Sequence, residues 1–216
     1  MEPKGEFTES LWTAIKPLYE KMIHHPFVIQ LKNGTLPHHC FEHYLAQDIL
    51  YIQDDSKALE MISEKAPSHD EQTFFKSLAE DGLETERVLH DDFLIHFKIS
   101  GTKGKSPVIE DYTRFLIIHA SQSSYQIAAA ALLPCFWVYY KVGNHIVSHY
   151  SKNNIYQKWI DTYQGEEYEM YTGKFIEIVE KLAAVLSEKE QSQMRQAFIT
   201  STRFELHFFN ESMQEK

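Results

Sequence analysis

Residues Leu132 to Tyr140 read LLPCFWVYY and lie in the longest uncharged stretch of the sequence. The alanines and leucines of this stretch favour a helix, and Pro134 removes one backbone N–H, which predicts a bend. Cys135 follows directly after the predicted bend. By helical period it shares a face with Ala131 and Tyr139, which leaves room for a flat ligand beside the thiol. A simpler interpretation stays open, in which Cys135 is a small apolar side chain of a buried helix.

The same helical period extends over the rest of the chain. Apolar residues recur at intervals of three and four in every long segment, and no segment alternates convincingly with the period of two that is typical of strands. The sequence therefore predicts an all-α protein, a multi-helix bundle of about eight or nine helices. The chain has 216 residues, and no linker rich in Pro, Gly or Ser divides it. We expect one helical domain over residues 1–216.

Composition restricts the classes of partner. Lys and Arg number 21 against 31 Asp and Glu, a net charge of −10, so we expect no binding to nucleic acid or to a membrane. The uncharged stretch is too short to span a bilayer. Two cysteines in unlike contexts and a polar start without an apolar leader predict a reducing, cytoplasmic location. The many Phe and Tyr residues suggest a cavity lined by aromatic rings.

Two carboxylates fall on predicted apolar helix faces. Asp48 lies on the inward face of a helix that starts near Pro37, one turn from Tyr51. A buried carboxylate is costly unless it is paired or hydrogen-bonded, so Asp48 is either a structural acceptor or a group that recognises a ligand. Glu205 is placed in the same way in the last predicted helix, beside Phe208. Both alternatives stay open on these patterns alone.

Groups of potential metal ligands are interpreted as structural. One group gathers at a predicted helix start and consists of His38, His39, Cys40 and His43. Such close neighbours point in different directions around a helix axis, so they cannot all reach one ion. Glu86 and His90 are one turn apart and are expected to bond to each other in the core. The Glu-x-x-His spacing of di-iron bundles does not occur. We expect no metal site.

Six short motifs, taken together, resemble one family. They are His25-Pro26-Phe27, Gly34-Thr35-Leu36, Gln47-Asp48-x-x-Tyr51-Ile52, Pro134-Cys135-x-Trp137-x-Tyr139, Trp159-Ile160-x-x-Tyr163 and Glu205. In this order they resemble the TenA-type thiaminase II family over nearly the whole chain. The resemblance implies a fold like that of haem oxygenase but without haem, no cofactor, and a homotetramer.

The resemblance also implies a reaction and a set of site residues. The reaction is hydrolysis of 4-amino-5-aminomethyl-2-methylpyrimidine to the hydroxymethylpyrimidine in thiamin salvage, together with cleavage of thiamin. By this resemblance Cys135 adds to the pyrimidine ring, Glu205 protonates a ring nitrogen and Asp48 holds the amino group. The residues implied to position the substrate and the sulfur are Tyr51, Tyr112, Tyr139 and Tyr163. This agrees with the residue patterns, because a buried carboxyl keeps its proton to higher pH and a protonated aminopyrimidine accepts a nucleophile.

Two departures from the family pattern and two alternative functions accompany this interpretation. Phe209 stands where a larger aromatic residue is usual, which affects the expected pocket size and leaving-group preference. Tyr168 stands where phenylalanine is common, and we expect little consequence. One alternative is a non-catalytic pyrimidine-binding or regulatory protein on the same fold. The other is a metal-dependent oxidase, which needs a cluster of carboxylates and histidines.

Overall fold

The regular elements of this protein are all α-helices in the part of the chain that its computed structural model describes, which confirms the predicted all-α class. That part comprises residues 1–88, 104–148, 154–161 and 165–214, without the side chains of residues 85–87. In chain order the helices are α1 (Glu6–Ile23), α2 (Pro26–Asn33), α3 (His38–Lys65), α4 (His69–Val88), α6 (Pro107–Gln122), α7 (Tyr125–Val147), α8 (Gln157–Ile160), α9 (Glu166–Ala183) and α10 (Glu188–Ser212).

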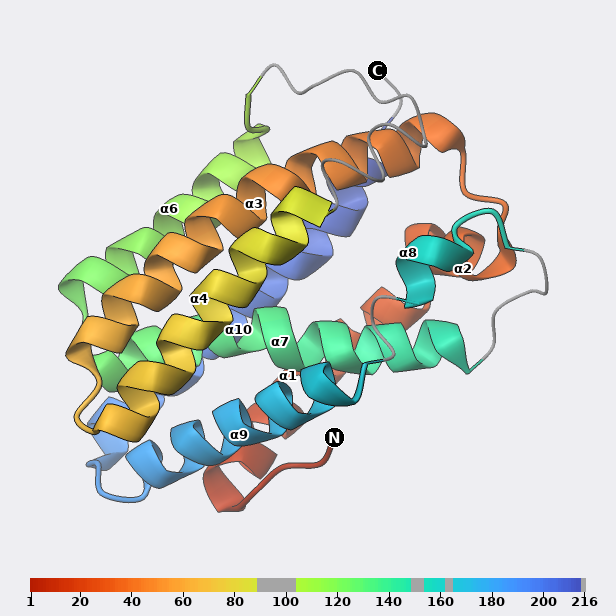
Figure 1. Ribbon diagram of the computed structural model, residues 1–216. Helices are drawn as coiled ribbons and strands as arrows, with labels where there is room; N and C mark the ends of the chain where they lie inside the picture. The colour runs from red at the N-terminus through yellow and green to blue at the C-terminus, as the bar shows by residue number, and fades with distance from the viewer. Residues whose placement is uncertain (89–103, 149–153, 162–164, 215–216) are drawn as a thin grey trace.

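Helix α7 carries the uncharged stretch and lies at the centre of the bundle. It packs against α1, α2, α3, α6, α8, α9 and α10. Figure 1 shows α3 between α4 and α6, with α7 and α9 below them. All side chains from Ala128 to Pro134 are buried, so the apolar stretch forms the core of the bundle. The helix continues through Pro134 as one element.

Several helix ends follow sequence signals. The Ser106 hydroxyl accepts a hydrogen bond from the Ile109 backbone N–H at 3.2 Å, directly before Pro107 at the first helical position. Ser187 and Glu190 form a capping box at the start of α10. Helix α2 ends at Gly34, whose φ of 71° lies in the left-handed region that glycine adopts without strain.

Buried polar contacts hold α6 against α3. The Gln47 side chain on α3 accepts a hydrogen bond from the Ser106 N–H at 2.8 Å and donates one to the Gly104 carbonyl at 3.1 Å. Lys105 forms an ion pair with Asp54, also on α3. Because these contacts join the start of α6 to the middle of α3, they fix the position of the α6 side chains that follow.

Helices α3 and α4 approach closely at Gly82. A Cβ atom at this position would come within 2.7 Å of the Ser56 hydroxyl oxygen on α3, which is closer than packed atoms tolerate. Gly82 therefore permits the spacing of the two helices beside residues 55 and 56.

No helix in the described ranges is long and apolar enough to cross a membrane.

Candidate active site

Cys135 lies where α3, α6, α7 and α10 meet. Its side chain is partly exposed, and the hydroxyl of Tyr51 on α3 forms a hydrogen bond with the thiol. Helix α9 also contacts this turn, because the Tyr168 hydroxyl donates to the backbone carbonyls of Cys135 at 3.3 Å and of Phe136 at 3.2 Å. From the sequence we expected little consequence of a tyrosine at position 168, but its hydroxyl has two acceptors in the turn of α7 that carries Cys135.

Glu205 projects from α10 into the same region and is 1% exposed. The Tyr112 hydroxyl on α6 donates to Glu205 Oε1 at 2.5 Å, and Tyr139 on α7 forms a second hydrogen bond with the carboxyl group. Burial raises the pKa of Glu205 to about 8, although the two phenol hydrogen bonds act in the opposite direction. At neutral pH the side chain is therefore mostly a neutral acid that can give up a proton.

The two phenols next to Glu205 are themselves held. Since Tyr112 gives its one proton to Glu205, the Ser201 hydroxyl 3.0 Å away must donate to Tyr112. Tyr44 on α3 donates to the Tyr139 hydroxyl at 3.2 Å. The residues in these contacts lie on α3, α6, α7 and α10, so the orientation of the Glu205 carboxyl group is fixed by the packing of the bundle.

Two further buried carboxyl groups, Asp48 and Asp55, lie two turns apart on α3. Burial raises the pKa of Asp48 to about 7, and the negative charge of Asp55 adds to the effect. Burial also raises the pKa of Asp55 to about 7, against a hydrogen bond from the Tyr51 hydroxyl at 3.3 Å. Among the described residues, neither Asp48 nor Asp55 forms an ion pair with a basic side chain. The site therefore contains more acidic groups than basic ones.

The same surroundings disfavour a free thiolate. Burial raises the pKa of the Cys135 thiol well above its ordinary range, and the charges of Asp55, Glu205 and Asp48 raise it further, in that order. The Tyr51 hydrogen bond favours the thiolate but does not reverse the direction. A nucleophilic Cys135 therefore needs a nearby group that takes its proton as it reacts.

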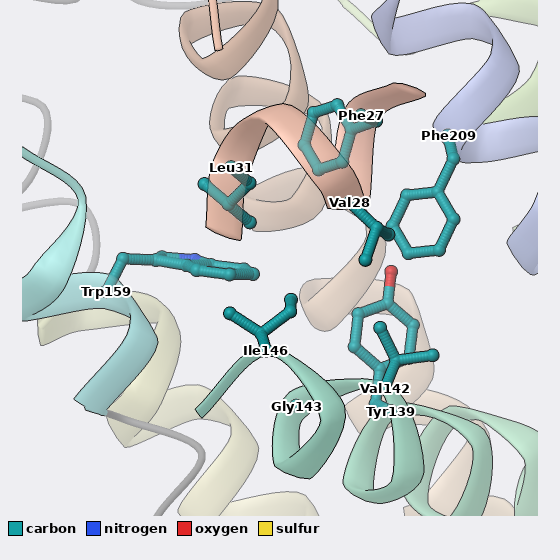
Figure 2. A pocket seen from close by; sticks show the side chains of 9 residues that line it. All are labelled: Phe27, Val28, Leu31, Tyr139, Val142, Gly143, Ile146, Trp159 and Phe209. Carbon is teal, nitrogen blue, oxygen red and sulfur yellow. The ribbon is translucent and has the colours of Figure 1, made fainter. Parts of the chain in front are cut away.

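An apolar pocket adjoins this cluster at Tyr139. Figure 2 shows the pocket between α2, α7, α8 and α10, with the Tyr139 hydroxyl pointing toward Phe209 and Val28. Its lining residues are Phe27, Val28, Leu31, Tyr139, Val142, Gly143, Ile146, Trp159 and Phe209. Phe209, the residue that departs from the family pattern, stacks on Phe27 with ring centroids 5.3 Å apart. Phe209 is therefore one of the side chains that limit the size of this pocket.

The structure brings together six of the seven residues that the sequence analysis assigned to the site. They are Cys135, Glu205, Asp48, Tyr51, Tyr112 and Tyr139. Tyr163 lies outside the described residues, as do His90 and the side chain of Glu86. The structure places these six residues near one another, while the roles assigned to them stay predictions.

Asp55 is the acid that sequence reasoning missed. It lies seven residues after Asp48 and four after Tyr51, so helical period alone places it on the same face. The apolar pattern of this helix is interrupted after Ile52, and the adjacent Asp54 makes position 55 resemble part of an exposed charged turn. In the structure Asp54 faces Lys57 and Lys105, whereas Asp55 is 6% exposed.

The potential ligands at the start of α3 have separate partners. The His43 ring contacts a carboxylate oxygen of Glu211 on α10 at 2.9 Å, and His38 pairs with Glu42. His39 contacts the thiol of Cys40 at 3.3 Å. Within the described residues no group of three His, Cys, Asp or Glu side chains is arranged to hold a metal ion.

Solved structures identify the class of fold. A TenA homologue from Pyrococcus furiosus superposes with a TM-score of 0.91 at 21% identity, covering 96% of this chain and all of that one. A domain from Shewanella denitrificans with a haem oxygenase-like fold superposes with a TM-score of 0.71 at 12% identity, covering 97% and 92% of the two chains. The bundle therefore has the haem oxygenase-like fold, as the sequence predicted.

Sequence relatives identify the family within that class. The profile of the TENA/THI-4/PQQC family matches residues 12–215, so the chain belongs to this family. The aminopyrimidine aminohydrolase of Bacillus subtilis is 30% identical over 94% of this chain and 88% of its own length. The thiamine biosynthesis multifunctional protein ThiED of Corynebacterium efficiens is 30% identical over the whole of this chain, which spans only 29% of that relative's length.

Proposed function

We propose that this protein is an aminopyrimidine aminohydrolase of the thiaminase II type. It would hydrolyse 4-amino-5-aminomethyl-2-methylpyrimidine to the hydroxymethylpyrimidine in thiamin salvage, and also cleave thiamin. Family membership and the name of the Bacillus subtilis relative support the reaction class. The observation that carries the proposal is a thiol beside an acid that stays protonated at neutral pH, Cys135 and Glu205.

The chemistry follows from the need to make an aminopyrimidine electrophilic. Glu205 gives its proton to a ring nitrogen while the Cys135 sulfur forms a bond to a ring carbon, so the electrons displaced from the ring are neutralised as they arrive. The adduct then expels the group on the methylene carbon, and water takes its place. When the sulfur leaves, Glu205 takes its proton back. A pKa of about 8 suits both transfers near neutral pH.

Asp48 and the tyrosines orient the ring in this mechanism. An ionised Asp48 can accept hydrogen bonds from the exocyclic amino group of the pyrimidine. The rings of Tyr51 and Tyr112, with centroids 4.9 Å apart, offer aromatic surface to a flat ligand. Tyr139 joins the Glu205 contact to the apolar pocket, whose free volume of about 10 Å³ leaves no room for a large leaving group in this arrangement of side chains. We also propose, from the family resemblance, that Tyr163 positions the substrate.

The experiment is to incubate the purified protein with thiamin and, separately, with aminomethylpyrimidine, and to follow hydroxymethylpyrimidine by chromatography. We expect product from at least one substrate, and loss of it in Cys135→Ser. Cys40→Ser is the matched control, because Cys40 is a buried thiol near the start of α3. Binding by calorimetry without product would favour the non-catalytic pyrimidine-binding alternative. Activity that depends on a metal found in the purified protein would favour the oxidase alternative.

The proposal includes a homotetramer in the cytoplasm. The resemblance to the TenA-type family supports the tetramer, and the exposed side chains of Val185 (84%), Ile155 (60%) and Met170 (59%) are available for contacts between subunits. A reactive thiol that must stay reduced supports the cytoplasmic location. Light scattering at micromolar concentration should give four times the 25.3 kDa chain mass. A mass near that of one chain would contradict the tetramer.

A further inference from the structure

Asp55 is a buried carboxyl group that the reaction proposed above leaves without a role. It is 6% exposed on α3, and the Tyr51 hydroxyl donates to its Oδ1 atom at 3.3 Å. A buried acid without a cation is costly to a fold. Among the described residues, Tyr51 is its hydrogen-bond partner. The position of Tyr51 therefore decides what Asp55 can do.

Tyr51 lies between Asp55 and the thiol of Cys135. A phenol has one proton and its oxygen can also accept. While Tyr51 gives that proton to an ionised Asp55, its oxygen is left to accept the S–H of Cys135. Once the thiol proton has moved, Tyr51 donates to the thiolate, which is the direction in which its hydrogen bond lowers the pKa of the thiol. The three groups form a chain in which every donor faces an acceptor, from sulfur through phenol to carboxylate.

The charges in the site favour movement of a proton along this chain. The titratable groups coupled to Asp55 are Asp48 and Tyr51 on α3, Cys135 on α7 and Glu205 on α10, none of them a cation. The titratable Asp81 on α4 is exposed. A thiolate beside an ionised Asp55 would place two negative charges in a poorly solvated site. Transfer of the thiol proton to Asp55 keeps the total charge unchanged.

We propose that Asp55 takes the proton of Cys135, through the Tyr51 hydroxyl, as the sulfur adds to the pyrimidine ring. The S–H bond breaks and its proton passes to the Tyr51 oxygen, while the Tyr51 proton passes to Asp55. The sulfur electrons form the bond to the ring carbon, and the displaced ring electrons take the proton of Glu205. Asp55 becomes neutral as Glu205 becomes ionised. The return of both protons releases the sulfur. This inference rests on the proposed function.

The first test uses the proposed reaction. Asp55→Asn keeps an oxygen that accepts from Tyr51 but cannot take a proton, so we expect kcat to fall roughly 10²-fold with little change in KM. The kcat of Tyr51→Phe should fall by a similar factor. The kcat of the double variant should be no lower than that of the slower single variant. Glu60→Gln is the matched control, because Glu60 is an exposed carboxylate on the same helix.

Two results would overturn the relay. One is additive losses in the double variant, which would mean that the two residues act independently. The other is a kcat of Asp55→Asn within a few-fold of the wild type. Thermal melts of each variant show whether a loss of rate reflects loss of folded protein.

A second test needs no substrate and separates this inference from the proposed function. Iodoacetamide alkylation of Cys135 at pH 7 is followed by mass spectrometry of its peptide, so that Cys40 does not contribute. If Asp55 takes the thiol proton, Asp55→Asn and Tyr51→Phe should both slow alkylation, by about 10-fold. If Asp55 merely repels the thiolate, Asp55→Asn should react as fast as the wild type or faster. That outcome would refute the relay even in an active enzyme, and slow alkylation would support it even if no pyrimidine were turned over.

Discussion

Helices α3 and α10 carry buried acidic groups in two places, and the two places differ in how the acid is compensated. Near the start of α3, Glu211 lies 2.9 Å from the His43 ring, with the two side chains 12% and 16% exposed. In the middle of α3, Asp48 and Asp55 lie near Glu205 of α10, and in the described part of the chain no basic side chain forms an ion pair with any of the three. The first arrangement is that of a structural contact. The second leaves the protein with acids that are neutral only when they are protonated.

The difference separates stability from function. A buried carboxyl group with a partner helps to hold two helices together, whereas three without a cation disfavour the folded state whenever they ionise. Such groups persist where they perform chemistry, and strongly shifted pKa values gather at functional sites for this reason. Substitutions in the two places should therefore have opposite effects on activity and on stability.

The largest effect is expected at the thiol. Cys135→Ser removes the nucleophile with little change in shape, so turnover should fall by about 10³-fold or more while product still binds. The measurement is the rate of hydroxymethylpyrimidine release, with Cys40→Ser as the control. A rate near that of the wild type would show that no covalent adduct forms at Cys135.

Glu205→Gln should have the next largest effect. The amide keeps a donor and the shape but cannot transfer a proton, so turnover should fall roughly 10²-fold with little change in product binding. Because the acid acts in its protonated form, the wild-type rate should decline as pH rises through about 8, the pKa of Glu205. An unchanged rate and pH profile in the variant would remove Glu205 from the mechanism.

Asp48→Asn tests recognition in the same cluster. Loss of a charged acceptor should weaken aminopyrimidine binding by about 10- to 100-fold, since hydrogen bonds to charged groups contribute about 1.5–3 kcal/mol. Calorimetry measures the affinity. Asp111→Asn is the control, because Asp111 is exposed and paired with Arg114. Unchanged affinity would assign Asp48 a structural role.

His43→Ala tests the compensated acid instead. It leaves Glu211 half-buried without its partner and should lower the free energy of unfolding by about 1–3 kcal/mol. The rate per folded molecule should stay within about twofold of the wild type. His24→Ala is the control, since its pair with Glu20 is exposed and long, at 3.8 Å, and should contribute little. A large loss of rate with unchanged stability would contradict the contrast between the two places.

The smallest effect concerns stability and pH. Asp48, Asp55 and Glu205 have pKa values in the folded protein of about 7, 7 and 8, above their ordinary range. The folded state therefore binds more protons than the unfolded state, and stability is lost as pH rises through 7 to 8. Each of these groups should lower the melting temperature by a few degrees between pH 6 and pH 8.5, at roughly 2–4 °C per kcal/mol. Asp48→Asn should reduce the change of melting temperature with pH. An equal change in the variant would show that the raised pKa of Asp48 is not one of its causes.

Much of the fold was predictable because local signals agree with the packing. The caps at Ser106 and Ser187 and the glycine after α2 mark helix ends that the structure reproduces. The burial of Glu205 followed from its place among phenylalanines. Such signals depend on residues close in sequence, so they do not require knowledge of which helices meet.

The missing part of the site depends on contacts between helices. Helical period could place Asp55 on the inward face, but only the meeting of α3 with α7 shows that Tyr51 joins it to the thiol. The pairing of His43 with Glu211 spans 168 residues and likewise cannot be inferred from either segment alone. Chemistry that depends on two or three helices becomes visible only when their relative positions are known.

The close approach of α4 to α3 has a consequence for directed evolution of this protein. Gly82 faces Ser56, the residue that follows Asp55, and even a methyl group at position 82 would press on that hydroxyl. The Ser56 Cβ atom would be 4.0 Å from the added methyl group, so an alanine there requires the Ser56 hydroxyl to turn away, and bulkier residues press on the turn of α3 that holds Asp55. Position 82 lies outside the pocket lining, so a library restricted to that lining would not sample changes beside the turn of α3 that holds Asp55.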